Sequence, residues 1–519
     1  MRQSHRLIIS ALSNFTGQLA HMIVGFVLPP YVVSQIGTAQ YGLVRVTGAI
    51  LRFIALAQVG TPQALSRFVS VELARKDKDA VSRVISTGSA ILLVSSLAGA
   101  GVLAVAVWRP ELLLQVPEGV PRSTVRMLVL VMGGMGVLGL PLSMGTVSFT
   151  SREMFFQLNL LKIGGQALRI SLVFLFLGAF NGGLIAYVAA TTSATLTQLV
   201  AIFIVGLLLF EGVRLSWRLV TFDMFKRVFG YGIQVFVNSF AYLMYIEFDT
   251  IMIGKLLDNQ AVTRFDFALK WNILMRAVVG TVLSVAIPSA AKKEALGDRQ
   301  SLRILFLRMT KMSLTATLPA MVFLGVFRYR LMLTWALSDN FGVEACNATA
   351  ALMLPILVAE SFIAISGAGA QVLMGMGRLR FLTLTNFIFG PLNVIMVFVL
   401  LKGFGLGLMS IVLLYAAIAV LRSGIMIPAF VCRSLEVRPM TVIRKALAGP
   451  LAAAAMLLPA AWAIYRLTPP RGWFGLFLAA ALVMIVYLPL VYLVGFDAYD
   501  RKLFSDMVVK VLSRLRRPR

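Results

Sequence analysis

The chain has few charged side chains for its length, and few of these are acidic. Only 13% of its 519 residues are Asp, Glu, Lys or Arg, whereas a soluble domain averages about 25%. Hydrophobic residues make up 59%, and the mean hydropathy is +0.89. This composition excludes a soluble enzyme, a nucleic-acid-binding module and a disordered protein, and we therefore expect no nucleic-acid partner.

Residues that hold metals, disulfides and nucleotides are also scarce. The two cysteines, Cys346 and Cys432, are too few for a disulfide framework or a metal site. The two histidines, His5 and His21, leave no histidine metal centre. The GxxxxGK[ST] loop that an ATP-driven pump would need is missing from the sequence. The sequence predicts no catalytic residues, no metal and no cofactor, and thus a protein that is not an enzyme.

The chain is instead rich in apolar stretches that are long enough to cross a bilayer, which takes roughly 20 residues each. Fourteen can be marked: 10–36, 41–70, 84–108, 123–150, 156–178, 181–210, 225–257, 261–290, 303–327, 347–376, 380–402, 405–431, 443–466 and 472–495. They predict an all-α integral membrane protein with about fourteen transmembrane helices. A count of twelve would require two pairs of stretches to be re-entrant. The first stretch lacks a signal-peptide cleavage pattern and is predicted to be retained.

Basic residues concentrate in alternate loops. The loops 71–83, 211–227, 292–308 and 432–445 and the tail 501–519 are rich in Lys and Arg, whereas 37–40, 179–180 and 403–404 are short and nearly uncharged. By the positive-inside rule, both termini are predicted to be cytoplasmic. Most of the formal net charge of +27 therefore sets topology.

The two halves of the chain look duplicated. Three features recur with an offset of about 220–227 residues: Glu72-Leu73-Ala74-Arg75-Lys76 with Lys293-Glu294-Ala295-Leu296, Ser151-Arg152 with Gly377-Arg378, and the turn 178–182 with the turn 403–407. Six spans separate each pair, so the repeats have the same orientation in the membrane, as in transporters that bind substrate between two bundles. The expected organisation is two pseudo-symmetric six-helix bundles over 1–210 and 211–431, two further helices over 432–496 and a basic cytoplasmic tail over 497–519.

The second stretch carries a polar face. At 100° per residue, Arg45, Arg52, Gln63 and Arg67 lie within a narrow sector. Guanidinium groups on one face suit a pyrophosphate. Two other interpretations remain open: pairing with Asp or Glu of another helix, and, for Arg45 and Arg67, extension to the membrane surface.

The fifth stretch repeats this pattern, because Lys162, Gln166 and Arg169 share one face. Lys162 lies near the cytoplasmic end, where it can extend to the surface, and Arg169 is deeper. Together the two stretches predict a cationic wall in the first half. Such a wall favours an anionic substrate and would repel a cationic drug.

The seventh stretch has Tyr231, Asn238, Tyr242 and Asp249 close to one line, and Glu247 points away from it. Asn238 and Tyr242 are predicted to hydrogen-bond or stack on sugars. The alternative is that the tyrosines anchor the helix at the membrane interface.

Three carboxylates within the stretches, Asp249, Asp266 and Glu360, are candidates for coupling to an ion. Asp249 can alternatively pair with an arginine, and Asp266 with Lys270 one turn later. Arg276, near mid-depth, is a further candidate for substrate binding. The alternative for Glu360 is a static pair with Arg276, Arg169 or Arg422.

The chain resembles a known family in several short motifs. These are the glycine turns, the loop Ala74-Arg75-Lys76-Asp77-Lys78-Asp79, the stretch 248–254 and Gly375-Met376-Gly377-Arg378. They are similar to the polysaccharide-transport branch of the multidrug/oligosaccharidyl-lipid/polysaccharide (MOP) exporter superfamily. The resemblance covers roughly residues 7–431, with the last two spans as the usual extension.

The resemblance implies a flippase of the bacterial inner membrane that moves undecaprenyl-pyrophosphate-linked oligosaccharide repeat units for O-antigen, lipopolysaccharide or exopolysaccharide synthesis. It implies alternating access, possible coupling to H⁺ or Na⁺, and contact with membrane lipids, a polysaccharide polymerase and a chain-length regulator. Alternatives are a lipid II-type flippase and a MATE-like multidrug or cation antiporter. A membrane-embedded polysaccharide polymerase or ligase fits less well, because no outer loop exceeds about 20 residues.

Overall fold

The structure is a computed structural model that describes residues 2–58, 60–117, 119–210, 212–283, 286–498 and 500–501. Over these residues the chain is helical, and the β structure within them is limited to one isolated bridge between Ser338 and Phe341. The all-α prediction is confirmed.

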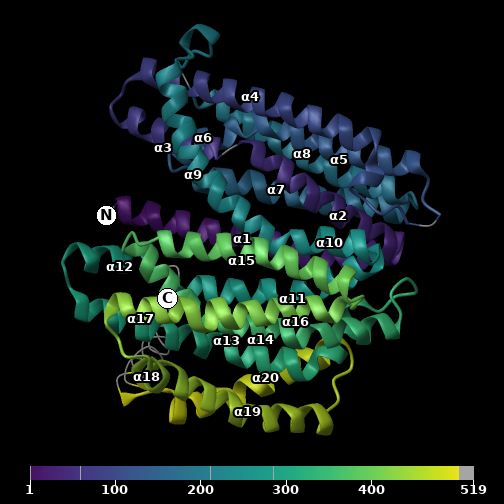
Figure 1. Cartoon of the computed structure of the whole chain (residues 1–519), viewed down its shortest axis with the longest axis vertical. Coiled ribbons are helices and arrows are strands. Elements are labelled where there is room, and N and C mark those ends of the chain that lie inside the picture. Colours follow the sequence, from purple (N-terminus) through teal and green to yellow (C-terminus); the bar gives the residue numbers. More distant parts are fainter. Residues whose placement is uncertain are drawn as a thin grey trace, which may run out of the picture. The chain divides into compact units, whose positions relative to one another are not determined.

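The first half of the chain contains eight α-helices (Figure 1). They are α1 (Arg2–Ile36), α2 (Thr38–Ala55), α3 (Thr61–Ala74), α4 (Lys78–Trp108), α5 (Arg122–Leu142), α6 (Met144–Ser151), α7 (Phe155–Phe174) and α8 (Leu184–Leu208). Short 3₁₀ turns lie at η1 (Leu56–Gln58) and η2 (Pro110–Leu112), and a π turn, η3 (Leu175–Ala179), ends α7.

The second half follows a 3₁₀ turn, η4 (Trp217–Leu219). Its helices are α9 (Phe222–Ile246), α10 (Phe248–Leu256), α11 (Asn259–Leu283), α12 (Ala286–Ala295), α13 (Arg299–Ala336), α14 (Val343–Gly375), α15 (Arg380–Phe398), α16 (Leu408–Ala419) and α17 (Ile427–Leu435). The C-terminal part adds α18 (Pro439–Val442), α19 (Ala448–Leu467) and α20 (Gly472–Leu490). Four π turns are η5 (Val399–Gly403), η6 (Val420–Met426), η7 (Ile443–Leu447) and η8 (Val491–Gly495).

Helix boundaries repeat between the halves. Thr38 and Asn259 begin α2 and α11, and Lys78 and Arg299 begin α4 and α13, each pair 221 residues apart. Later the separation becomes 224: η3 and η5 follow α7 and α15 at equivalent positions, and Leu184 and Leu408 begin α8 and α16. The predicted duplication is thus visible in the backbone.

The turns between equivalent helices match in detail. Lys76 N donates to Leu73 O at 3.1 Å, and Gly297 N donates to Glu294 O at 3.0 Å, each closing the end of a helix. The residues with positive φ correspond in three pairs: Lys76 with Gly297, Glu153 with Gly377, and Asn181 with Gly405. The predicted match of Ser151-Arg152 with Gly377-Arg378 is therefore two residues out of register. The left-handed residue, and not the arginine, marks the equivalent position.

The helices after these first turns begin in the same way. Asp77 Oδ1 accepts from Ala80 N at 2.8 Å, and Asp298 Oδ1 accepts from Ser301 N at 2.9 Å. The bonds from Ser301 hold the pKa of the exposed Asp298 carboxyl below its usual value. These N-caps satisfy backbone donors that the first turn of a helix leaves unpaired.

Eleven helical segments among the described residues are long and apolar enough to cross a membrane. Each of the fourteen predicted stretches is helical, but 41–70, 225–257 and 261–290 fall outside the eleven because their helices are broken or more polar. The count of fourteen therefore stays a prediction. These three stretches carry most of the predicted site residues.

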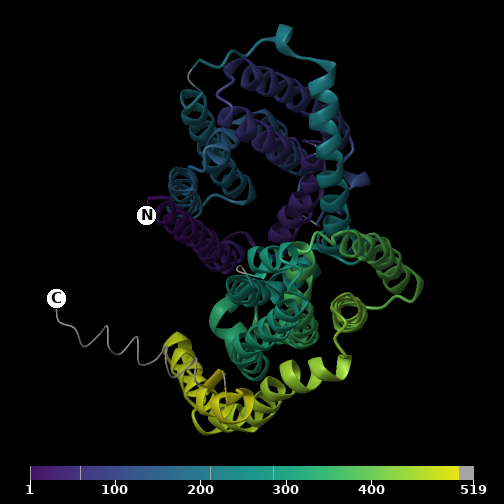
Figure 2. The ribbon, with the colours of Figure 1, turned by 90° about the vertical axis from the view of Figure 1, so that its left-hand side faces the viewer.

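Two compact units emerge from contacts between helices. One comprises Met1–Asp266, Ser338–Phe341 and Asn386–Leu408, and the other comprises Phe267–Leu337, Gly342–Thr385 and Met409–Arg519. In the first unit α4 packs on α5 and α3, and α7 packs on α8 and α1. In the second, α13 packs on α14 and α19, and α19 lies beside α20, as the two views of the yellow segment show (Figures 1 and 2).

Candidate functional site

Arg52 in the last turn of α2 forms an ion pair with Glu247. The distance from Arg52 Nη2 to Glu247 Oε2 is 2.7 Å. Glu247 lies between α9 and α10, where the seventh stretch breaks. That Glu247 points away from the polar face of the seventh stretch stays a prediction, because the side chains of Asn238 and Tyr242 on that face lie outside the described residues. The sequence left pairing open for Arg52, and the structure shows that pairing.

Arg45, two turns earlier on α2, pairs with Asp266 at the start of α11. Arg45 Nη2 lies 2.7 Å from Asp266 Oδ1, and the hydroxyl of Tyr41 donates to Asp266 Oδ2 at 2.8 Å. Only 7% of the Asp266 side chain is exposed. Both carboxylate oxygens are therefore engaged by side chains of α2.

Arg67 on α3 has a different kind of partner. Its guanidinium lies 5.0 Å from the ring centre of Tyr231 on α9 and 5.9 Å from that of Phe68. Within the described part of the chain no carboxylate pairs with it. A cation over an aromatic face keeps its N–H groups free to meet an anion. Tyr231 thus orients Arg67, which the sequence had not indicated.

Helix α7 presents Lys162, Gln166 and Arg169. Lys162 is exposed and Arg169 is half-buried. Arg169 Nε and Gln166 Oε1 are buried and have no hydrogen-bond partner in the structure. Among the described residues neither cation of α7 has an acidic partner, so both keep unused hydrogen-bonding capacity.

Asp249, near the start of α10, is buried beside α15. Its Oδ1 accepts from Asn393 Nδ2 at 2.6 Å, and both residues are almost fully buried. No salt bridge reaches this carboxyl within the ranges that the structure describes. It differs in this respect from Asp266.

The second compact unit holds its own polar cluster. Glu360 on α14 is 3% exposed and accepts from Arg276 Nη2 at 2.7 Å and Arg276 Nε at 3.1 Å. The hydroxyl of Tyr415 also donates to Glu360, at 3.0 Å, and Asn272 lies at 3.5 Å. The pairing of Glu360 with Arg276, one of the alternatives open from sequence, is observed.

Some predicted residues lie outside the described side chains. Asn238 and Tyr242 belong to α9, but nothing is described of their side chains. Their predicted contacts with sugars stay predictions. In contrast, Tyr41, Glu247, Asn393 and Tyr415 are partners that the sequence analysis missed. Their polarity within apolar stretches could have identified them, because a polar side chain there usually has a partner or lines a cavity.

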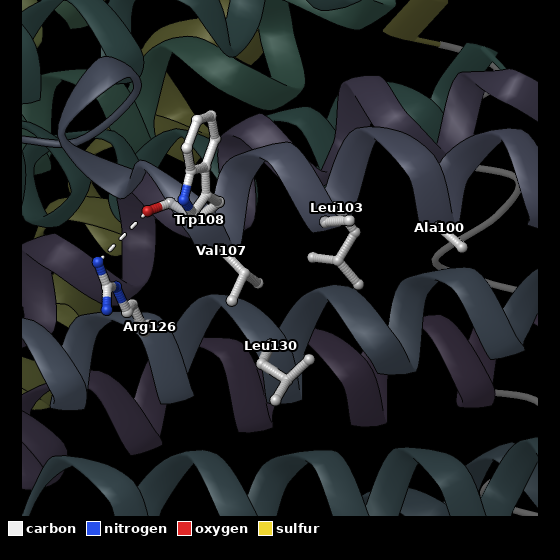
Figure 3. A pocket seen from close by; sticks show the side chains of 7 residues that line it. Ala100, Leu103, Val107, Trp108, Arg126 and Leu130 are labelled. Atoms are coloured by element: carbon white, nitrogen blue, oxygen red, sulfur yellow. Dashed lines mark hydrogen bonds between the residues drawn. The ribbon is translucent and has the colours of Figure 1, made fainter.

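A cavity of about 500 Å³ lies between α4 and α5. Its lining is apolar except for Arg126, which donates to the carbonyl oxygen of Trp108 at 3.4 Å (Figure 3). A polar headgroup requires several converging polar groups, so this groove does not suit one. No group of three or more His, Cys, Asp or Glu that could bind a metal occurs in the described residues.

A comparison with known families identifies the chain. The profile of the family described as "Polysaccharide biosynthesis protein" matches residues 8–293, more than half of the chain. The chain belongs to this family of polysaccharide biosynthesis proteins. Among curated proteins it is similar to the uncharacterized membrane protein EpsK of Bacillus subtilis (strain 168), with 21% identity over 96% of this chain and 97% of that protein.

Solved structures share the fold. The lipid II flippase MurJ in an inward closed conformation matches with a TM-score of 0.71 and 13% identity, covering 96% of this chain and all of the other. An inward-facing multidrug resistance MATE family transporter of the MOP superfamily matches with a TM-score of 0.64 and 14% identity, covering 82% and 96%. The protein is thus a multi-pass integral membrane protein with a MOP-type fold. The resemblance seen in the sequence is confirmed, and the relatives with named activities are transporters and flippases.

Proposed function

We propose that the protein is a flippase that moves undecaprenyl-pyrophosphate-linked oligosaccharide repeat units across the bacterial inner membrane by alternating access, with both termini in the cytoplasm. The observation that supports this most is a set of cations within the predicted spans that have no carboxylate partner among the described residues: Arg67, Lys162 and Arg169. A charge within a span is costly unless something compensates it. A pyrophosphate headgroup that enters from the membrane would supply that compensation.

Arg52 and Arg276 are proposed to join in headgroup binding. Each is 41% exposed although one side of its guanidinium is held by a carboxylate. A guanidinium has five N–H donors, so the ion pair with Glu247 orients the Arg52 group and uses only part of its donors. Asn238 and Tyr242 are proposed to contact the sugars, while the prenyl tail stays in lipid.

Asp249 is the proposed site of coupling to H⁺ or Na⁺. Asp266 and Glu360 each hold an arginine at 2.7 Å, whereas the partner of Asp249 within the described ranges is the amide of Asn393. A buried carboxyl with no cationic partner gains most from a proton or a sodium ion. A polysaccharide polymerase and a chain-length regulator would use the exported units, whether these serve O-antigen or exopolysaccharide synthesis.

The experiment reconstitutes the purified protein in liposomes and measures movement of a polyprenyl-pyrophosphate oligosaccharide between leaflets. We expect Arg169→Gln and Arg67→Gln each to reduce the rate by tenfold or more, since a lost charge-assisted bond contributes about 1.5–3 kcal/mol. The matched control is Arg227→Gln, which removes an exposed pair with Asp223 on α9. Wild-type rates in both test variants would overturn the cationic-site proposal.

Two further experiments test the lipid II-type activity and the proposed ion coupling. Lipid II in place of the oligosaccharide tests the lipid II-type activity, because its headgroup offers the same pyrophosphate. Asp249→Asn should abolish any dependence of the rate on a proton or sodium gradient. If the wild-type rate is the same with and without either gradient, the coupling proposal fails while the flippase proposal stands.

A further inference from the structure

Arg45 and Asp266 occupy positions that the duplication makes equivalent. They lie 221 residues apart, the same separation as between the first residues of α2 and α11. One copy carries a cation and the other an anion, and the two meet at 2.7 Å. All the contacts involved belong to the first compact unit, which extends to Asp266.

Further bonds fasten α2 to the first turns of α11. Thr263 Oγ1 donates to Thr38 O at 2.7 Å. At Gly42 the backbones come so close that a Cβ atom would lie 1.8 Å from the carbonyl oxygen of Asn259. Together with the bond from the Tyr41 hydroxyl to Asp266, these contacts run along two turns of α2.

Both oxygens of Asp266 are already engaged by side chains of α2. Arg45 uses Oδ1 and Tyr41 uses Oδ2. Tyr187 and Glu247 are the other ionisable groups that face Arg45 from neighbouring elements. The pair is therefore better suited to holding two helices together than to binding a substrate phosphate or a coupling cation.

We propose that Arg45 and Asp266 are a positioning pair that locks α2 to α11, and that the transport cycle opens this lock once in each turnover. The proposal rests on the alternating access proposed above. The lock lies at the start of α2, at the opposite end from the basic loop after α3. In the proposed orientation the pair lies toward the outer face of the membrane.

The equivalence of the two positions provides an unusual test. Exchanging the charges, Arg45→Asp with Asp266→Arg, keeps one cation and one anion at equivalent backbone sites. Tyr41 precedes position 45 by one turn, so its hydroxyl can still reach a carboxylate there. A residue that binds substrate would not tolerate such an exchange.

The measurement is hydrogen exchange of the purified full chain in lipid nanodiscs. We expect Arg45→Asp and Asp266→Arg each to accelerate hydrogen exchange in segments 38–46 and 259–266 by about tenfold or more, because two like charges then face each other. Exchange in the paired helices α4 and α5 should not change. The double variant with the swapped charges should return the hydrogen-exchange rates of both segments to within about threefold of the wild-type rates.

Flipping activity in liposomes gives the second readout. Each single charge reversal should lower the rate at least tenfold, and the double variant should recover most of it. Reversal of the exposed Arg227 serves as the control and should alter neither readout. If both single variants exchange like the wild type, or if the double variant behaves like the singles, the lock is overturned.

The two proposals can fail separately. Absence of flipping by the wild-type protein would refute the proposed function, while the exchange data would still decide whether the pair holds α2 to α11. Faster exchange throughout the first unit, with a lower melting temperature, would show a general structural role and overturn the lock. If the double variant restored the hydrogen-exchange rates but not the flipping rate, Arg45 would be assigned to substrate binding, and the lock would again be overturned.

Discussion

Neutralising Glu360 tests how strongly burial determines the contribution of an ion pair to the free energy of unfolding of this protein. In Glu360→Gln the side chain keeps its shape but loses its charge. Arg276 then faces an amide where it had bonds of 2.7 and 3.1 Å to a carboxylate. The hydroxyl of Tyr415 loses a charged acceptor at 3.0 Å.

The magnitude follows from the exposures of the two partners. Breaking a buried ion pair costs about 3–5 kcal/mol when the remaining charge has no access to water. Arg276 is 41% exposed and recovers part of its hydration. We therefore expect Glu360→Gln to lower the free energy of unfolding by about 2–3 kcal/mol, close to the value for one or two hydrogen bonds to a charged group.

The matched control lies in the same compact unit. Glu436 pairs with Arg303 at 2.6 Å, but its side chain is 81% exposed. Glu436→Gln removes the same charge from a pair of nearly the same length. An exposed pair contributes about 0.2–1 kcal/mol, so this variant should differ little from the wild type.

The assay is unfolding by SDS titration in mixed micelles, followed by tryptophan fluorescence. The double variant Glu360→Gln with Arg276→Gln should lose less than the sum of the two single losses, because the bond is lost only once. Equal losses for Glu360→Gln and Glu436→Gln would refute the reasoning. The length of an ion pair, and not its burial, would then set its contribution.

Three further outcomes are expected. Gly42→Ala should prevent correct folding, because its Cβ would overlap the carbonyl oxygen of Asn259, whereas Gly101→Ala, with nothing within 4 Å, should be tolerated; yield of monodisperse protein on size exclusion checks both. Lys311→Met should free the segment after α20, because the buried ammonium is bonded to Asp497 and Asp500, and hydrogen exchange over 491–498 should rise. The pKa of Asp298 is lowered on folding, so its capping contribution is present above the unfolded pKa and lost as pH falls through the folded pKa; the protection of amides at the start of α13, relative to their intrinsic exchange rates at each pH, should fall on acidification, and Asp298→Asn should remove that response.

The sequence predicted which segments are helical better than it predicted which side chains of different helices contact each other. Apolar stretches locate helices, because they depend on neighbours along the chain. The interruption at Glu247 was not predictable from periodicity, since the side chains on both sides are apolar enough to continue the helix. Glu247, at this interruption, pairs with Arg52.

The candidate site shows the same limit. A helical wheel groups Arg45 and Arg52 on one face, but the direction of a face does not identify what lies opposite. The bond between Asp249 and Asn393 spans 144 residues of sequence, and the bond between Glu360 and Arg276 spans 84. Such contacts depend on how helices pack, which composition and periodicity do not encode.

The opposite charges of Arg45 and Asp266 also bear on the history of the chain. If the two repeats began as identical subunits of a dimer, equivalent positions would have held the same residue, and two arginines or two aspartates would have repelled each other. An ion pair between equivalent positions becomes possible only when each copy can change without the other. The contact at 2.7 Å therefore requires that the two copies had diverged at this position. It makes the two positions complementary, so that a repeat replaced by a second copy of its partner would bring two like charges together here.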